Sequence, residues 1–309
     1  AMLMAVPAAA QPAEILKIIG SGATVVLPNG QTVAAVQGMK VDEKATINTG
    51  NAEVYLEAVS GAIATIKKNS QVIVETLAGP KPVLDLRGGN IVSQVDANKL
   101  RQAGKEYGIR TPRGVAAARG TVYAVSVAGQ AYTVVTGLGT VTITPQAPGA
   151  PSVTISAGGI SMSSVNGGAA VTAAEVASNP AANAAVMDAA SAAVAAVAVV
   201  AANPANFGAA ATTAVIELAQ TVATVVQQIP QAVQQAASTA AAAAPSQAAA
   251  IVTAAVNASA ASGGNVTQVA QQVTQAAAQG AASTTTTQEA AAAVAQNVAQ
   301  AASNAAATA

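Results

Sequence analysis

The sequence predicts an α+β protein in two segregated parts, an all-β part followed by an alanine-rich α-helical part. Short β-branched runs separated by Gly, Asn and Pro continue to about residue 165. From Val171 onward alanine, the best helix former, dominates. Charge divides the chain in the same way, because all thirteen basic residues and nine of the thirteen acidic ones lie at or before Arg119. The first part therefore carries a net charge of about +4 and the second about −4.

The expected strands of the first part alternate with turn signals. Pro28-Asn29-Gly30 separates two such runs, and in 52–59 the alternating residues Val54 and Leu56 would face one side, opposite Tyr55. Together the runs supply enough apolar positions for one core. The expected strands are 23–27, 31–36, 52–59, 62–66, 71–76, 83–86, 91–95, 121–127, 131–136 and 140–144.

The second part is divided by helix punctuation. Asn179-Pro180 and Asn203-Pro204 each pair a capping residue with a proline suited to the first helical position. The expected helices lie near 180–202, 206–229, 231–243, 246–261, 266–279 and 286–303. One carries an apolar stripe at steps of three and four residues, which predicts either a helix–helix interface or the inner face of an ordinary bundle. The stripe consists of Val215, Leu218, Val222, Val225 and Ile229.

Composition argues against an enzyme. The chain has no His, Cys or Trp, which excludes histidine-based catalysis, thiol chemistry and the usual zinc or haem ligands. Glu53 and Glu57 would lie ~13 Å apart on one strand face, too far for a glycosidase pair, so a solvated face is expected. We expect no catalytic residues, no cofactor and no metal.

The first ten residues are similar to the end of a secretory signal. An apolar stretch is followed by Pro7 and small residues, with Ala8 and Ala10 placed for cleavage before Gln11. An apolar N-terminal strand or an added leader is the alternative. The expected organisation is a signal remnant at 1–10, a β domain at 11–168 and a helical region at 169–309. The sequence contains no run of ~20 strongly apolar residues, so we expect no transmembrane span.

Several motifs in the β part resemble a known family. Thr49-Gly50 followed by an alternating strand, and above all the stretch 111–125, TPRGVAAARGTVYAV, are similar to the signature of FecR-type domains, with Ala118 where Val is usual. The resemblance covers roughly residues 15–165. It implies antiparallel sheets in a solenoid- or sandwich-like arrangement, export, and no enzymatic activity. The signature positions, expected to be structural, are Thr111, Pro112, Gly114, Val115, Arg119, Gly120, Thr121 and Tyr123.

A basic stretch precedes and overlaps the signature. It could contact an acidic polysaccharide or an acidic partner, although such runs are usually solvated surface. Its residues are Lys99, Arg101, Lys105, Arg110 and Arg113. Nucleic acid is not expected, because few aromatic residues lie nearby for base stacking.

Two functional hypotheses follow. The first is an exported, non-enzymatic structural protein that self-assembles into an extracellular fibre or surface layer as a homo-oligomer or polymer. The second is a periplasmic FecR-type sensing or binding module that engages another envelope protein. The first places the protein outside the cell or on its surface, and the second in the periplasm.

Overall fold

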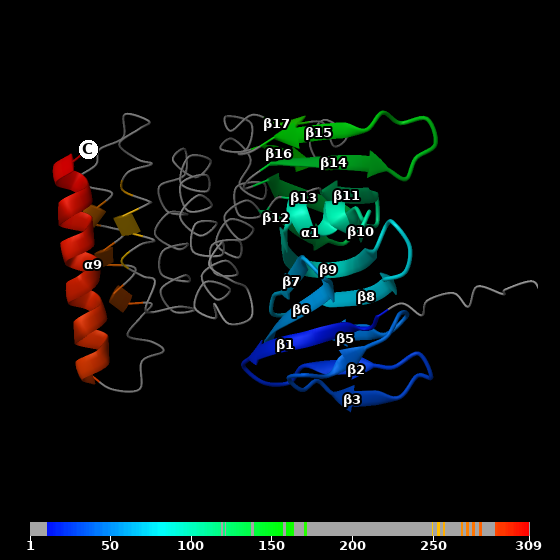
Figure 1. The fold of residues 1–309 in the computed structure, drawn as a ribbon, viewed down its shortest axis with the longest axis horizontal. Coiled ribbons are helices and arrows are strands. Elements are labelled where there is room, and N and C mark those ends of the chain that lie inside the picture. Colours follow the sequence, from blue (N-terminus) through cyan, green and yellow to red (C-terminus); the bar gives the residue numbers. More distant parts are fainter. Residues whose placement is uncertain are drawn as a thin grey trace, which may run out of the picture.

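The computed structural model describes residues 11–118, 120, 122–136, 139–156, 159–163, 170–171 and 288–308, with scattered residues between 249 and 279. Several features expected from the sequence lie outside these residues. They are the signal remnant, Arg119, Thr121, the stripe from Val215 to Ile229 and most of the expected helices. Figure 1 shows the strands stacked from β3 at the bottom to β15 and β17 at the top, with helix α9 at the far left of the view.

Two facing layers make up the β part. Sheet A follows the order β4 (Lys40–Val41), β1 (Ala13–Ile19), β6 (Glu53–Val59), β7 (Ala62–Ile66), β9 (Val83–Val95), β12 (Val122–Ala128), β13 (Ala131–Thr136), β16 (Ile160–Met162) and β17 (Ala170–Val171). Sheet B follows the order β3 (Thr32–Ala34), β2 (Thr24–Val26), β5 (Thr46–Asn48), β8 (Gln71–Thr76), β9, β10 (Tyr107–Thr111), β11 (Gly114–Ala118), β14 (Thr140–Pro145) and β15 (Val153–Ser156).

Strand β9 belongs to both sheets. Its first half, as far as Gly88, pairs with β8 in sheet B, and its second half, from Gly89, pairs with β12 and β7 in sheet A. Gly89 has a φ of +88°, a conformation that glycine adopts without steric cost. A β-carbon there would lie 2.3 Å from Ser70 Oγ, so the crossing point also needs a residue without a side chain.

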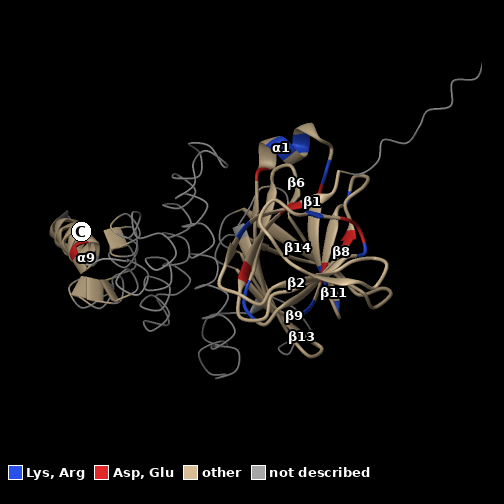
Figure 2. Cartoon of the chain, turned by 90° about the horizontal axis from the view of Figure 1, so that it is seen from below, with Lys and Arg blue, Asp and Glu red and all other residues tan. Residues whose placement is uncertain are grey.

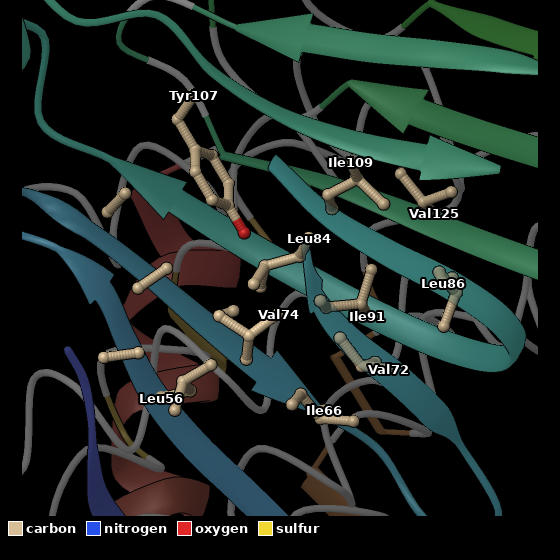
Figure 3. Packing of buried hydrophobic residues seen from close by; sticks show 14 of the residues in the cluster. Leu56, Ile66, Val72, Val74, Leu84, Leu86, Ile91, Tyr107, Ile109 and Val125 are labelled. Atoms are coloured by element: carbon tan, nitrogen blue, oxygen red, sulfur yellow. The ribbon is translucent and has the colours of Figure 1, made fainter. Parts of the chain in front are cut away.

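The core lies between the two layers. Alternate residues of each strand point into it, as the two-residue period of a pleated strand requires. Leu56, Ile66, Ile91 and Val125 come from sheet A, and Figure 3 shows them packed against the side chains of sheet B. Full burial of each such aliphatic side chain contributes roughly 1.5–3 kcal/mol. The sheet B residues labelled in the figure are Val72, Val74, Leu84, Leu86, Tyr107 and Ile109, with Leu86 and Ile91 on the shared strand.

The expected fold class is confirmed, but several strands were not expected from the sequence, namely β1, β4, β5, β10, β15, β16 and β17. Two further segments differ from expectation. The runs expected at 83–86 and 91–95 are one continuous strand, β9. The alanine-rich segment that begins at Gly114 belongs to none of the expected strands, yet it forms strand β11, which pairs with both β10 and β14. Alanine has low strand propensity, but here it fits between two strands, and sheet pairing outweighs local preference.

Helix α1 (Ala97–Gln102) joins β9 to β10, which pair in parallel. Asp96 caps its N-terminus, since the carboxylate accepts hydrogen bonds from the backbone N–H groups of Asn98 and Lys99. Leu100 anchors the helix in the core. Gly61 allows the close approach, because a β-carbon there would lie 2.7 Å from Lys99 Cβ. A parallel pair needs such a crossover connection.

Helix α9 (Gln288–Thr308) ends the described chain. The sequence expects a helix at 286–303, and the observed one extends five residues further. Val298, Ala302 and Ala305 are buried at helical spacing, and the scattered residues near 249–279 (orange in Figure 1) lie beside it. None of the described helices has the length and hydropathy to cross a membrane.

Candidate binding cleft and signature turns

The signature stretch builds a hairpin turn between β10 and β11. Thr111 pairs with Gly114 across the turn, and its buried hydroxyl Oγ1 donates to the Gly114 carbonyl at 3.0 Å. The same oxygen accepts from the backbone N–H groups of Arg113 at 3.3 Å and Gly114 at 3.2 Å. Pro112 occupies the first turn position, where its fixed φ is favourable. Thr111 therefore satisfies three backbone groups of one turn.

Further signature residues are needed for packing. A β-carbon on Gly114 would lie 2.7 Å from the Thr144 carbonyl oxygen, so β11 and β14 could not approach each other as they do. Tyr123 is fully buried, and its hydroxyl donates to the Ala116 carbonyl at 3.4 Å. Burial raises the pKa of Tyr123 well above its usual value. Val115 lies half-buried on the outer face of sheet B.

A second polar cluster explains the threonine of Thr49-Gly50. Thr49 Oγ1 donates to the Lys67 carbonyl at 2.7 Å and accepts from the backbone N–H of Ser70 at 2.9 Å. Ser70 Oγ accepts in turn from the backbone N–H of Asn90 at 2.9 Å. Two hydroxyls thus link the β5–β6 turn, the β7–β8 turn and the crossing point of β9, where unpaired backbone groups would otherwise be buried.

A cleft opens where the segment that follows α1 meets the start of β1 and the end of β6. Its volume is about 720 Å³. Side chains of both charges line it, with Glu14 on β1, Glu57 on β6, Lys40 on β4 and Lys105 after α1. The remaining lining residues are Gln11, Pro12, Ala58, Val59, Ser60, Leu77, Ala78, Gly79 and Ala103. A concave surface of this kind fits a ligand or a peptide segment.

The charges of the cleft are unevenly paired. Glu14 and Glu57 are direct cross-strand partners, an arrangement that places two carboxylates on neighbouring strands of one sheet face. Lys40 forms an ion pair with Glu14 and donates a hydrogen bond to it. Lys105 donates to the Leu77 carbonyl at 3.3 Å. Glu57 has no ion-pair partner among the residues that the structure describes.

The signature stretch lies within the part of the chain that a family comparison matches. Residues 45–142 match the family model described as FecR protein. The β part contains a FecR domain. Two crystal structures of a "putative anti-sigma factor" from Parabacteroides distasonis resemble the chain, each with 13% identity, a TM-score of 0.34 and coverage of 41% of this chain. The chain spans 57% of the length of those structures. No curated protein matches it.

The five residues of the predicted basic stretch lie in two different parts of the FecR domain. Lys99 and Arg101 lie on α1, near Lys105 in the cleft, and Figure 2 shows α1 as a basic element at the edge of the domain. Arg101 donates to Asn98 Oδ1 at 2.6 Å. Arg110 and Arg113 lie elsewhere, on strand β10 and at its turn, where Arg113 Nε donates to the Gln130 carbonyl at 3.0 Å. The five residues therefore do not form one patch.

Arg110 belongs to a charge cluster on the outer face of sheet B. Arg110 pairs with Glu75 at 2.7 Å, and Arg87 pairs with Asp85 at 2.6 Å. Asp85 is buried, and this desolvation raises the pKa of its carboxyl, while Arg87 acts in the opposite direction. The two acids and two arginines pair with each other, so the cluster carries no net charge.

Sequence reasoning missed the acidic side of the cleft. Glu14, Lys40 and Glu57 are far apart in sequence, and their meeting depends on the β1–β4 and β1–β6 pairings. Prediction of the cleft would first require a strand at 13–19, and no sequence motif indicates that this strand pairs with β4 and β6. Among the residues that the structure describes, no group of three or more acidic side chains could hold a metal ion.

Proposed function

We propose that the protein is an envelope sensing or binding module whose FecR domain engages a segment of another envelope protein in the cleft formed by β1, β6 and the segment that follows α1. The family match at 45–142 supports a non-catalytic, envelope-associated role. Among the described signature residues, Thr111 and Tyr123 are engaged in a turn and in packing, which directs the search for a recognition site to exposed surface. The observation that carries the proposal is the cleft itself, which side chains of both charges line.

The electrostatics of the cleft indicate the chemistry of the partner. Like charges directly opposite each other on neighbouring strands are unfavourable, and Lys40 neutralises one of the two carboxylates. A Lys or Arg of the partner beside Glu57 would neutralise the other. Lys105, which also lines the cleft, can accommodate a carboxylate or a backbone carbonyl. We therefore propose a polar peptide segment with a basic side chain as the bound element.

A photo-crosslinking experiment tests this function. A photoreactive residue replaces Ser60, at the rim of the cleft, and in a matched control replaces Ser152, which lies exposed between β14 and β15. Each full chain is exposed to envelope extract, and the crosslinked protein is identified and purified. Its binding is then measured by calorimetry with the unaltered chain and with Glu57→Gln.

The expected result is a partner captured at Ser60 and not at Ser152, with binding weakened by about tenfold in Glu57→Gln and further weakened by added salt. Equal capture at both positions, or unchanged affinity of Glu57→Gln, would overturn the cleft as the binding site. Circular dichroism of each variant confirms that the fold is retained.

The self-assembling structural role has weaker support. Its sequence argument depends on the stripe from Val215 to Ile229, which lies outside the described residues. The binding module rests on a family match and on a cleft whose side chains are placed, and for this reason we prefer it. Light scattering over a range of concentrations distinguishes the two, because a binding module stays at constant mass without its partner.

A further inference from the structure

We propose that the outer face of sheet A is a docking surface for the alanine-rich segment 172–287 of the same chain. The surface consists of one cross-strand row in which each residue pairs with the next: Tyr55, Thr65, Val92, Ala124, Val135 and Ile160. None of the residues of this surface lines the cleft.

The row lies on the side of sheet A that faces away from the core. Leu56 and Val54 on β6 point into the core, so Tyr55 between them points outward. Val92 next to Ile91, and Ala124 next to Val125, repeat this arrangement on β9 and β12.

The outward row is nevertheless buried. Its six residues expose 1–4% of their surface. The sequence expects a solvated face around Tyr55, and burial of Tyr55 corrects that expectation. On the same face, Asn90 Oδ1 and Gln94 Oε1 are buried without a hydrogen-bond partner among the described residues. A layer therefore covers this face across several strands.

Sheet B provides an internal comparison. Its outer face carries Ile73, Val115 and Thr142 half-buried, and Thr154 exposed. Asp85 is buried there within its own charge cluster. Two outer faces of one domain thus differ, and the covered one is the more apolar.

The course of the chain identifies the covering segment. The row continues from Ile160 to Val171 on β17, the last described strand of the sheet, and 116 residues separate Val171 from Gln288. In Figure 1 the strands of sheet A lie on the side toward α9 and those of sheet B on the far side. Figures 1 and 2 both show α9 standing apart from the sheet, so α9 itself is not the cover.

The chemistry of segment 172–287 fits the surface. It contains no Lys or Arg, and its charged residues are Glu175, Asp188 and Glu217. Alanine and valine can pack against a flat sheet and bury apolar surface without desolvating charge. Because the segment begins at the edge of the surface, its effective concentration exceeds that of a second copy.

Crosslinking within the full chain tests the proposal. Tyr55 is replaced by p-azidophenylalanine, which has nearly the same shape, and Tyr132, which belongs to the core cluster, receives the same change as a control. Unlabelled and ¹⁵N-labelled chains are mixed before irradiation, so that mass spectrometry separates crosslinks within one chain from crosslinks between chains.

The expected result is crosslinking from position 55 to residues 172–287 of the same chain, while position 132 reaches residues of the FecR domain. Crosslinks between labelled and unlabelled chains would overturn the proposal in favour of a second copy. Crosslinks restricted to strands adjacent to β6, or to α9, would overturn it as well.

Thiol protection gives an independent measurement, because the chain has no cysteine. Ala124→Cys places a thiol on the covered face, and Ala117→Cys places one on the half-buried outer face of sheet B. In the full chain we expect Ala124→Cys to react with a thiol reagent at least about tenfold more slowly than Ala117→Cys, because its access requires local opening. Equal rates with an intact circular dichroism spectrum would show that the face is free.

Discussion

A β-carbon added to Gly120 would lie 2.1 Å from the β-carbon of Ala97, the first residue of α1. This contact gives the second glycine of the signature a physical role. It lets the segment before β12 pass directly against the start of the helix that joins β9 to β10. The φ of Gly120, +80°, adds a conformational reason for glycine at the same position.

Gly120→Ala should therefore destabilise the protein more than an alanine at a glycine with open surroundings. Gly129 has a φ of +60° and no atom within 4 Å of an added β-carbon, so Gly129→Ala should cost about 1–2 kcal/mol from the backbone alone. Gly120→Ala should lose a further ~1–3 kcal/mol through overpacking. Urea unfolding followed by circular dichroism measures both, and equal losses would contradict the packing argument.

Thr49→Val should lower the free energy of unfolding. The change keeps the shape of the side chain and removes the oxygen that accepts from the buried Ser70 N–H. An unsatisfied buried donor costs ~1–3 kcal/mol. Thr49→Ser retains the hydroxyl and should recover most of the loss, as equilibrium unfolding of the two variants will show. If Thr49→Ser is as unstable as Thr49→Val, the methyl group matters more than the hydrogen bonds.

Glu43 should contribute to stability in a pH-dependent way. Its Oε1 accepts from the backbone N–H groups of Leu77 at 2.5 Å and Ala78 at 2.9 Å, and these bonds lower the pKa of the carboxyl. A lowered folded-state pKa gives stability that is present above the unfolded pKa and lost as pH falls through the folded pKa. Glu43→Gln should thus be less stable than the unaltered chain at neutral pH, with the difference shrinking in acid.

The measurement is urea unfolding of both chains from neutral pH into the acid range. Asp42→Asn, an exposed neighbouring charge change, serves as the control. A difference between Glu43→Gln and the unaltered chain that stays constant with pH would mean that the carboxylate is not the source.

Three buried tyrosines should make the fold sensitive to alkali. Burial raises the pKa of Tyr55, Tyr107 and Tyr123 above the usual value. Neutral phenols are then favoured in the folded state, and stability is lost as pH rises above ~10, where unfolded tyrosine ionises. Their phenolate absorbance should appear together with the loss of the circular dichroism signal. Ionisation that precedes unfolding would show that these hydroxyls reach solvent.

The sequence predicts the β part well where alternation is clear. β6, β7, β8 and β13 match their expected ranges within one residue, because one face of each strand enters the core. Strands β10 and β11 escape prediction, since glycine and alanine at 108 and 116–118 suppress the β-branched signal. Their formation depends on partners on both sides, which local sequence does not reveal.

The candidate site is less predictable than the fold. The signature residues are recognisable from sequence, and Thr111 and Gly114 show why they are required. The cleft depends instead on the pairing of β1 with β6, which brings together Glu14 and Glu57 from 43 positions apart. Burial of the outer face of sheet A, which includes Tyr55, could have been inferred from β12 and β13. These two strands carry apolar residues on both faces, a pattern typical of strands covered on two sides.

The first and last strands of sheet A along the chain determine how the domain would respond to mechanical tension. The chain enters the sheet at β1 and leaves it at β17, at the opposite end of the strand order, so a pull on the two ends acts across the strands. The hydrogen bonds between antiparallel strands lie along that direction, so the strand pairs would separate one after another under load. Strand β9 is also hydrogen-bonded to β8 and β10 in sheet B, so its removal from sheet A would disrupt both sheets. We therefore expect the highest resistance to unfolding under force at this shared strand.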